Sequence, residues 1–324
     1  MLLAVAAVVI GLVILVWGAD RFVFGAAALA SALGISPLLI GLTVVGFGTS
    51  APEILIATIA ALDGSPGIAV GNAIGSNIAN IGLILGAAAV FVPLTMHSDL
   101  LRRELPVLLV VTLAAFLVLR DGKLGPNEGT MLLVGLVVTM LLLVRIAQQR
   151  RNQDPLAAGI EENIPSNCAA LPAAGWFVLG LLTLVIASRA LVWGAVEIAV
   201  TLGISELVIG LTIVAIGTSL PELAAAVMSA IKNQHELVIG NVVGSNIWNM
   251  LVVLGIPGLL APGPVPGEVL TRDMPMLLVL TLALFAMGYS SRSHGTINRL
   301  EGGLLLTCFV AYQGWIVWQT QAAL

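Results

Sequence analysis

One polar hexapeptide occurs twice in this chain of 324 residues. Gly-Thr-Ser-Ala-Pro-Glu at 48–53 returns as Gly-Thr-Ser-Leu-Pro-Glu at 217–222, which is 169 residues later. The same offset aligns the Gly-Asn-x-x-Gly-Ser-Asn-x-x-Asn pattern of 71–80 with 240–249, and 25 of the 53 positions aligned around the motifs are identical. Shared hydrophobicity can match Leu with Val, but it does not match Thr, Ser, Pro, Glu and Asn. The sequence therefore indicates an internal duplication, and any fold must contain two related halves.

The two copies lie in a chain with very little charge. Hydrophobic residues make up 59% of the chain and charged residues only 9%, whereas soluble domains carry about 25% charged residues. A soluble enzyme and a disordered scaffold are therefore excluded. The 13 basic residues against 17 acidic ones leave no basic field for nucleic acid. We predict an all-α polytopic membrane protein.

Apolar runs are long enough to cross a bilayer about ten times, since a spanning helix needs about 20 largely apolar residues. The runs lie at 2–19, 36–62, 67–92, 104–119, 129–147, 172–196, 205–231, 237–261, 274–289 and 302–319. The first run has no basic residue before it and no evident cleavage site, so we interpret it as a retained helix rather than a secretory signal.

Each copy of the duplication carries five predicted spans. Because five is odd, the second copy must enter the bilayer from the opposite face. We therefore predict two inverted five-helix repeats, 1–147 and 172–324, joined by a cytoplasmic linker at 148–171. Inverted repeats place a binding site near the membrane midplane and permit alternating access, which is typical of secondary transporters.

The distribution of Lys and Arg predicts the orientation, because short cytoplasmic loops carry an excess of both. With ten spans, one side collects Arg21, Arg102, Arg103, Arg145, Arg150, Arg151, Lys232, Arg292 and Arg299, and the other collects Arg120, Lys123 and Arg272. We expect the larger group to be cytoplasmic. Both termini then lie outside the cytoplasm, in a plasma (inner) membrane.

Two carboxylates are expected inside the membrane. Glu53 falls midway along the second predicted span and Glu222 midway along the seventh. An unpaired carboxylate in hydrocarbon is costly, so such a residue marks a functional site by default. The alternatives are a structural ion pair or a permanently protonated group that joins helices, but we expect no Lys or Arg in the middle of any span. The pair indicates the centre of a site.

Hydroxyl groups and interrupted backbone are expected around each carboxylate. Thr49 and Ser50 share a helix face with Glu53 because they precede it by four and three residues. Pro52 lacks an N–H and its ring clashes with the preceding turn, so the helix should bend near Gly48 and release the carbonyls of 45–48. A proline kink without further role is the alternative. The second copy repeats the arrangement with Thr218, Ser219, Pro221 and the carbonyls of 214–217.

A polar stripe on the third and eighth predicted spans is expected to face the two carboxylates. Its members recur at intervals of four residues: Asn72, Ser76 and Asn80, repeated as Asn241, Ser245 and Asn249. Helix packing through small residues and amides is the alternative. Asn77 and Asn246 fall on another face, and we expect them to bond interrupted backbone rather than the ligand.

The donor atoms of these residues indicate the class of ligand. They are carboxylate, hydroxyl, amide and carbonyl oxygens, and no Cys, Met or His joins them, since His97, His235 and His294 fall in predicted loops. Zn²⁺ and Cu⁺ are therefore disfavoured, whereas Ca²⁺ takes about 6–8 oxygens and suits the set. One Ca²⁺, several Na⁺ or protons can neutralise two carboxylates. A site that accepts either kind of ion, but not both together, can support exchange.

These paired motifs resemble the sodium/calcium exchanger branch of the cation/Ca²⁺ exchanger superfamily. The resemblance implies Na⁺/Ca²⁺ exchange by alternating access, with Glu53 and Glu222 as the central Ca²⁺ ligands. It also implies that the remaining Na⁺ and Ca²⁺ ligands are Thr49, Ser50, Ser76, Thr218, Ser219 and Ser245. Both ends of the stripe are amides here, whereas some relatives carry an aspartate at the second, and the linker lacks a large regulatory domain.

We therefore predict a secondary active antiporter that exchanges Na⁺ for Ca²⁺, with these ions and the lipid bilayer as its partners and with no cofactor. Ca²⁺/H⁺ or K⁺-dependent exchange at the same site is the closest alternative. A membrane hydrolase would use Glu53 and Glu222 as general acid and base, which requires different surroundings for the two carboxyl groups. A passive cation channel is disfavoured by the inverted duplication.

Overall fold

The computed structural model describes residues 1–33, 37–64, 66–96, 101–151, 169–202, 215–288 and 295–322. Within these residues the protein is helical apart from short strands, and seven helices are long and apolar enough to cross a membrane, or eight if one bent pair counts as a span. Two shorter apolar helices, Glu104–Leu119 and Leu220–Ile231, fall in the fourth and seventh predicted runs. Every predicted run therefore contains a helix, while length and composition support seven or eight spans.

The first half of the chain begins with a long helix and then alternates α-helices with π-helical turns. Its elements are α1 (Leu2–Leu33), α2 (Pro37–Ile40), η1 (Gly41–Val45), α3 (Gly46–Thr49), α4 (Ala51–Leu62), α5 (Pro66–Ala79), η2 (Asn80–Leu85), α6 (Gly86–Phe91), β1 (Leu94–Met96), α7 (Leu101–Leu119), β2 (Lys123–Leu124) and α8 (Pro126–Arg151).

The elements of the second half largely follow the same order, with one additional π-helical turn, η6, after β3. They are α9 (Ala170–Thr201), α11 (Ala215–Thr218), α12 (Leu220–Ile231), α13 (His235–Trp248), η5 (Asn249–Val253), α14 (Gly255–Leu260), β3 (Gly263–Pro264), η6 (Val269–Asp273), α15 (Met274–Gly288), β4 (Gly295–Ile297) and α16 (Arg299–Ala322). The connection between α8 and α9 falls in the predicted linker 148–171, of which 152–168 lies outside the described residues.

Charged residues lie inside α1 and α9, where the sequence predicts either a helix end or an uncharged centre. The first run was expected to end near residue 19, but α1 continues through Asp20 and Arg21. Asp20 forms an ion pair of 2.7 Å with Lys232, and the Arg21 guanidinium lies 5.1 Å from the ring centre of Trp176. Because these charges have partners, they do not terminate the helix. Arg189 lies exposed within α9.

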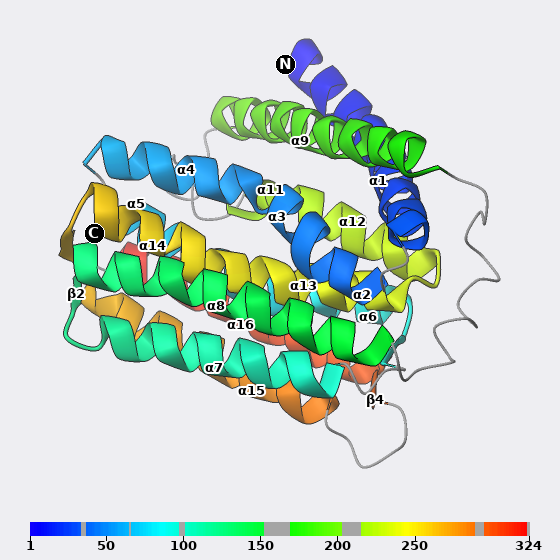
Figure 1. Ribbon diagram of the computed structural model, residues 1–324. Helices are drawn as coiled ribbons and strands as arrows, with labels where there is room; N and C mark the ends of the chain where they lie inside the picture. The colour runs from blue at the N-terminus through cyan, green and yellow to red at the C-terminus, as the bar shows by residue number, and fades with distance from the viewer. Residues whose placement is uncertain are drawn as a thin grey trace.

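Helices α1 and α9 pack along one another across one side of the molecule (Figure 1). Their backbones approach closely at a glycine of each helix. A Cβ at Gly25 of α1 would overlap the backbone of Phe177, and one at Gly180 of α9 would overlap the backbone of Phe22. Small residues at such crossings let helix backbones meet, which is a common packing device in membranes.

Helices α5 and α13 lie at the centre of the other helices. In the most apolar part of each long helix, the buried share is 89% for His235–Leu260 and 72% for Pro66–Phe91. In the other long helices it is 22–33%. Both central helices pass into π-helical turns, η2 and η5, which begin at the equivalent residues Asn80 and Asn249. π-Helical turns of this kind occur frequently at functional sites.

Two antiparallel strand pairs join the first half of the chain to the second. In one, Leu94 of β1 lies opposite Ile297 of β4; in the other, Lys123 of β2 lies opposite Pro264 of β3. The labels of β2 and β4 stand at opposite ends of the helix bundle (Figure 1). Each half therefore contributes one strand to each end.

Candidate ion-binding site

Glu53 lies in the first turn of α4, directly after a sharp bend. The helices Gly41–Thr49 and Ala51–Leu62 meet at 49° with Ser50 between them, and Pro52 occupies the start of the second helix, where its missing N–H has no helical partner to lose. The predicted bend is therefore confirmed, two residues later than Gly48. The Glu53 side chain is 1% exposed.

The bend leaves the Gly46 carbonyl bonded, contrary to the expectation that the carbonyls of 45–48 are released. The Ser50 N–H donates to it at 3.1 Å, because a helical bond persists up to the bend. The Ser245 hydroxyl lies 3.5 Å from the same oxygen. This carbonyl contributes to the contact between the bend and α13 instead of remaining free for an ion.

Glu222 occupies the equivalent place in the second half of the chain. It lies in the first turn of α12, directly after Ser219, with Pro221 at the helix start, and it is 3% exposed. Among the expected free carbonyls, that of Gly217 accepts a hydrogen bond of 2.8 Å from Ser188 of α9. Residue 214 and the side chain of Thr218 lie outside the described residues.

Thr49 connects the first bend to the second half of the chain. Its hydroxyl donates to Oδ1 of Asn241 at 3.0 Å and lies 3.2 Å from the Ser245 hydroxyl, both on α13. The Glu222 carboxyl group lies beside Thr49 and close enough to Glu53 for the two carboxyl groups to interact. Five of the residues that the sequence singles out therefore meet in one buried cluster.

The other stripe residues are Asn72, Ser76, Asn80 and Asn249, and all of them except Asn72 are buried. Asn72 donates to the backbone carbonyl of Glu53 at 3.2 Å, so this amide holds the helix that carries the carboxylate. Asn80 and Asn249 are 2% and 1% exposed, and Ser76 and Ser219 are also buried. Three stripe residues, Asn72, Asn241 and Ser245, therefore contact the first bend, as the sequence predicts. His235 begins α13, and His97 and His294 lie outside the described residues.

Several buried oxygens of this region have no hydrogen-bond partner within the described residues. They belong to Ser50, Glu53, Asn77, Glu222 and Asn249. A buried polar atom without a partner costs about 1–3 kcal/mol, and more when it is charged. Oxygen atoms of this kind coordinate hard cations such as Ca²⁺ and Na⁺. In the described part of the chain no cluster of three His, Cys, Asp or Glu residues offers a softer site.

Asn77 and Asn246 participate more than the sequence indicates. Asn77 donates to the backbone carbonyl of Asn246 at 3.2 Å, which agrees with the expected bond to backbone. The side chain of Asn246, however, accepts a hydrogen bond of 3.0 Å from Asn80, which is a member of the stripe. The shared Gly-Ser-Asn-x-x-Asn motif was the available signal. Ser188 had no comparable signal, because it is an isolated serine in an apolar run.

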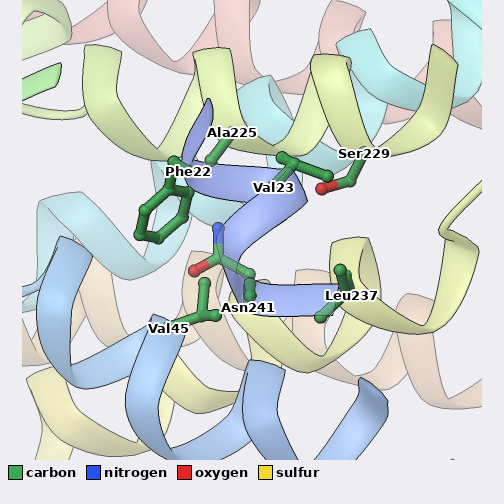
Figure 2. Close-up of a pocket in the computed structure, with 8 residues that line it drawn as sticks. Phe22, Val23, Val45, Ala225, Ser229, Leu237 and Asn241 are labelled. Atoms are coloured by element: carbon green, nitrogen blue, oxygen red, sulfur yellow. The ribbon is translucent and has the colours of Figure 1, made fainter. Parts of the chain in front are cut away.

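A small pocket adjoins the cluster at Asn241. Figure 2 shows the Asn241 amide among apolar side chains that include Phe22 of α1 and Val45 of η1, with Ser229 of α12 on the far side. The amide nitrogen of Asn241 has no hydrogen-bond partner within the described residues. Asn241 therefore belongs both to the cluster and to the pocket wall.

Comparison with known proteins shows the family of this chain. The family model described as "Sodium/calcium exchanger protein" matches residues 3–145 and 172–318. The chain belongs to this family. It is similar to inner membrane protein YrbG of Escherichia coli K12, with 41% identity over 98% of both chains. It is also similar to sodium/calcium exchanger MaX1 of Methanosarcina acetivorans, with 32% identity over 94% of this chain and 95% of that one.

A solved structure of the sodium-calcium exchanger NCX_Mj, soaked with Na⁺ and Sr²⁺, has the same fold. The TM-score is 0.82 at 33% sequence identity, and the match covers 96% of this chain and 97% of that one. The two regions matched by the family model contain both hexapeptide motifs and both stripes. Membership of the exchanger family rests on these two long regions as a whole. It identifies the chain as a membrane transporter of cations.

Proposed function

We propose that this protein is a secondary active antiporter that exchanges Na⁺ for Ca²⁺ by alternating access. The observation that carries the proposal is the meeting of Glu53 and Glu222, two buried carboxylates with unpartnered oxygens, beside Thr49 at a helix bend. Two carboxylates neutralise one Ca²⁺, and hydroxyl and amide oxygens complete a hard coordination shell. Na⁺ ions compete for the same charges, so Na⁺ displaces Ca²⁺ and Ca²⁺ displaces Na⁺.

We assign the ligand set to the twelve residues of the bends and stripes. They are Glu53, Glu222, Thr49, Ser50, Ser76, Asn80, Thr218, Ser219, Ser245, Asn249, Asn72 and Asn241. Membership differs in kind: Asn72 and Asn241 each use one amide atom in a protein hydrogen bond. The free atom of Asn72 is its Oδ1, which can coordinate an ion. The free atom of Asn241 is Nδ2, which cannot, so Asn241 can offer a cation only the second lone pair of Oδ1.

The proposal includes ten spans arranged as two inverted repeats, 1–147 and 172–324, with both termini outside the cytoplasm. The strand pairs support it. β1 and β4 would both follow an odd number of spans and β2 and β3 an even number, so each pair would join loops on one side of the membrane. Strands at equivalent places in the two halves, β1 and β3, belong to different pairs, as inversion requires.

The test is uptake of ⁴⁵Ca²⁺ by proteoliposomes that contain the purified full chain. We expect uptake driven by an outward Na⁺ gradient with pH clamped on both sides, and no uptake with equal Na⁺ on both sides. Uptake driven only by a pH gradient would instead establish Ca²⁺/H⁺ exchange, and an additional requirement for external K⁺, on the same side as Ca²⁺, would establish K⁺-dependent exchange. Uptake down the Ca²⁺ gradient alone, without any counter-ion, would contradict exchange altogether.

A further inference from the structure

Each repeat carries one asparagine that lies off the stripe, Asn77 in α5 and its equivalent Asn246 in α13. Both side chains are completely buried, with 0% exposed. Because the motif around them is the same in both copies, the sequence predicts equal roles. Their hydrogen-bond partners differ, however, which indicates that the two residues have different roles.

Asn246 accepts two hydrogen bonds from the first half of the chain. Its backbone carbonyl accepts from Nδ2 of Asn77 at 3.2 Å, and its side-chain Oδ1 accepts from Nδ2 of Asn80 at 3.0 Å. Oδ1 of Asn77, which is the atom equivalent to that acceptor, has no partner within the described residues. Asn246 thus contacts a proposed ligand directly, and Asn77 only contacts backbone.

The bond from Asn80 to Asn246 determines which end of the Asn80 amide faces the ion. An amide side chain carries two N–H donors on one arm and an oxygen acceptor on the other. With Nδ2 committed to Asn246, Oδ1 of Asn80 is directed away from Asn246. A flipped amide would present N–H groups to a cation, which is repulsive.

On this basis, and resting on the proposed ion exchange, we propose that Asn246 is the positioning residue that orients the Asn80 amide with its oxygen toward the transported cation. Side chains that hold a ligand in orientation influence metal affinity strongly even though they do not touch the ion. Asn246 therefore acts across the boundary between the two halves. A change at Asn246 should alter ion affinity in preference to the rate of the conformational cycle.

The test compares half-saturating Ca²⁺ concentration and maximal rate in Na⁺-driven ⁴⁵Ca²⁺ uptake. Asn246→Leu removes the acceptor, and we expect about a tenfold rise in half-saturating Ca²⁺ with a maximal rate within about twofold of wild type. Asn246→Asp keeps an oxygen at the acceptor position and replaces only Nδ2, which has no partner within the described residues. We expect it to stay within about threefold of wild type.

Asn77→Leu is the matched control, since it makes the same change at the equivalent residue with the same burial and removes neither atom of the bond between Asn80 and Asn246. We expect it to raise half-saturating Ca²⁺ by less than about threefold. In the Asn80→Ala background, adding Asn246→Leu should raise it no further, because the two residues act through one contact. Equal effects of the two Leu variants, failure of Asn246→Asp to restore affinity, or additive effects would each overturn the proposal.

Folding and transport are separated by two further measurements. Each variant is checked by size-exclusion chromatography, and if a Leu variant fails, the pair Asn246→Ala and Asn77→Ala replaces it with the same expected ranking. Calorimetric titration of the detergent-purified proteins with Ca²⁺ measures affinity without transport. A wild type that binds Ca²⁺ but shows no counter-ion-dependent uptake would contradict the proposed function, while the ranking of affinities would still support or overturn the role of Asn246.

Discussion

Helices α5 and α13 carry the same motif but lie in different surroundings. Within the described residues, Gly244 and Asn241 of α13 are buried, whereas the equivalent Gly75 of α5 is exposed and Asn72 is half-buried. The counterpart of η1 in the second half, 210–214, lies outside these residues. The α13 face is covered by the bend of the first half, with Leu42 backbone against Gly244. In the described part of the chain, equal sequence therefore does not produce equal packing. For the proposed antiporter, unequal packing of two equivalent walls is what access from a single side requires.

The largest expected effect tests whether the two carboxylates contribute equally to transport. Glu53→Gln and Glu222→Gln should each lower Na⁺-driven ⁴⁵Ca²⁺ uptake by about 100-fold or more, since each removes a full charge from a buried cation site. Thermal unfolding of the purified variants checks that they fold. Full transport in either variant would remove that residue from the site and would show that the two halves differ in chemistry as well as in packing.

The next effect tests the packing difference directly. Gly244→Ala places a Cβ against the Leu42 carbonyl, and overpacking of this kind costs about 1–3 kcal/mol. We expect a lower unfolding temperature, measured by differential scanning fluorimetry of the detergent-purified protein. Gly75→Ala is the matched control, and its unfolding temperature should stay close to that of wild type. If both variants are destabilised equally, the two faces are packed alike in solution.

A smaller effect is expected at the residue that joins the bend to α13. Thr49→Val keeps the shape of the side chain but removes its bonds to Asn241 and Ser245. We expect half-saturating Ca²⁺ in the uptake assay to rise about tenfold, from loss of one proposed oxygen ligand and its hydrogen bonds. Thr58→Val is the control, because within the described residues the Thr58 hydroxyl donates to the Ile54 carbonyl of its own helix and not to another element. If half-saturating Ca²⁺ rises equally in both variants, Thr49 is not part of the site.

The smallest effect is expected at the ion pair between α1 and α12. Asp20→Asn removes the charge that faces Lys232, whose side chain is 31% exposed against 38% for Asp20. Ion pairs with this much exposure contribute about 0–1 kcal/mol, so the unfolding temperature should barely change. A large loss of stability would mean that this exposed contact is a main support between α1 and the end of α12.

Much of the site could be predicted because polar residues in an apolar chain are conspicuous. The bend at Pro52, the burial of Glu53 and Glu222, and the facing stripe all follow from short-range rules of helix geometry. The length of α1 could not be predicted in this way, because Lys232, the partner of Asp20, lies far along the chain. The different hydrogen bonds of Asn77 and Asn246 were also beyond prediction, because identical motifs contain no information about which copy packs more tightly.

The two strand pairs have a consequence for how the chain is made. Leu94 of β1 is buried against the strand of Ile297, which is synthesised last but one among the elements. When the first half has been synthesised, the backbone groups of β1 and the side chain of Leu94 therefore still lack the partners that the second half provides. Either half expressed alone should be unstable, and the two halves co-expressed as separate chains should recover one another.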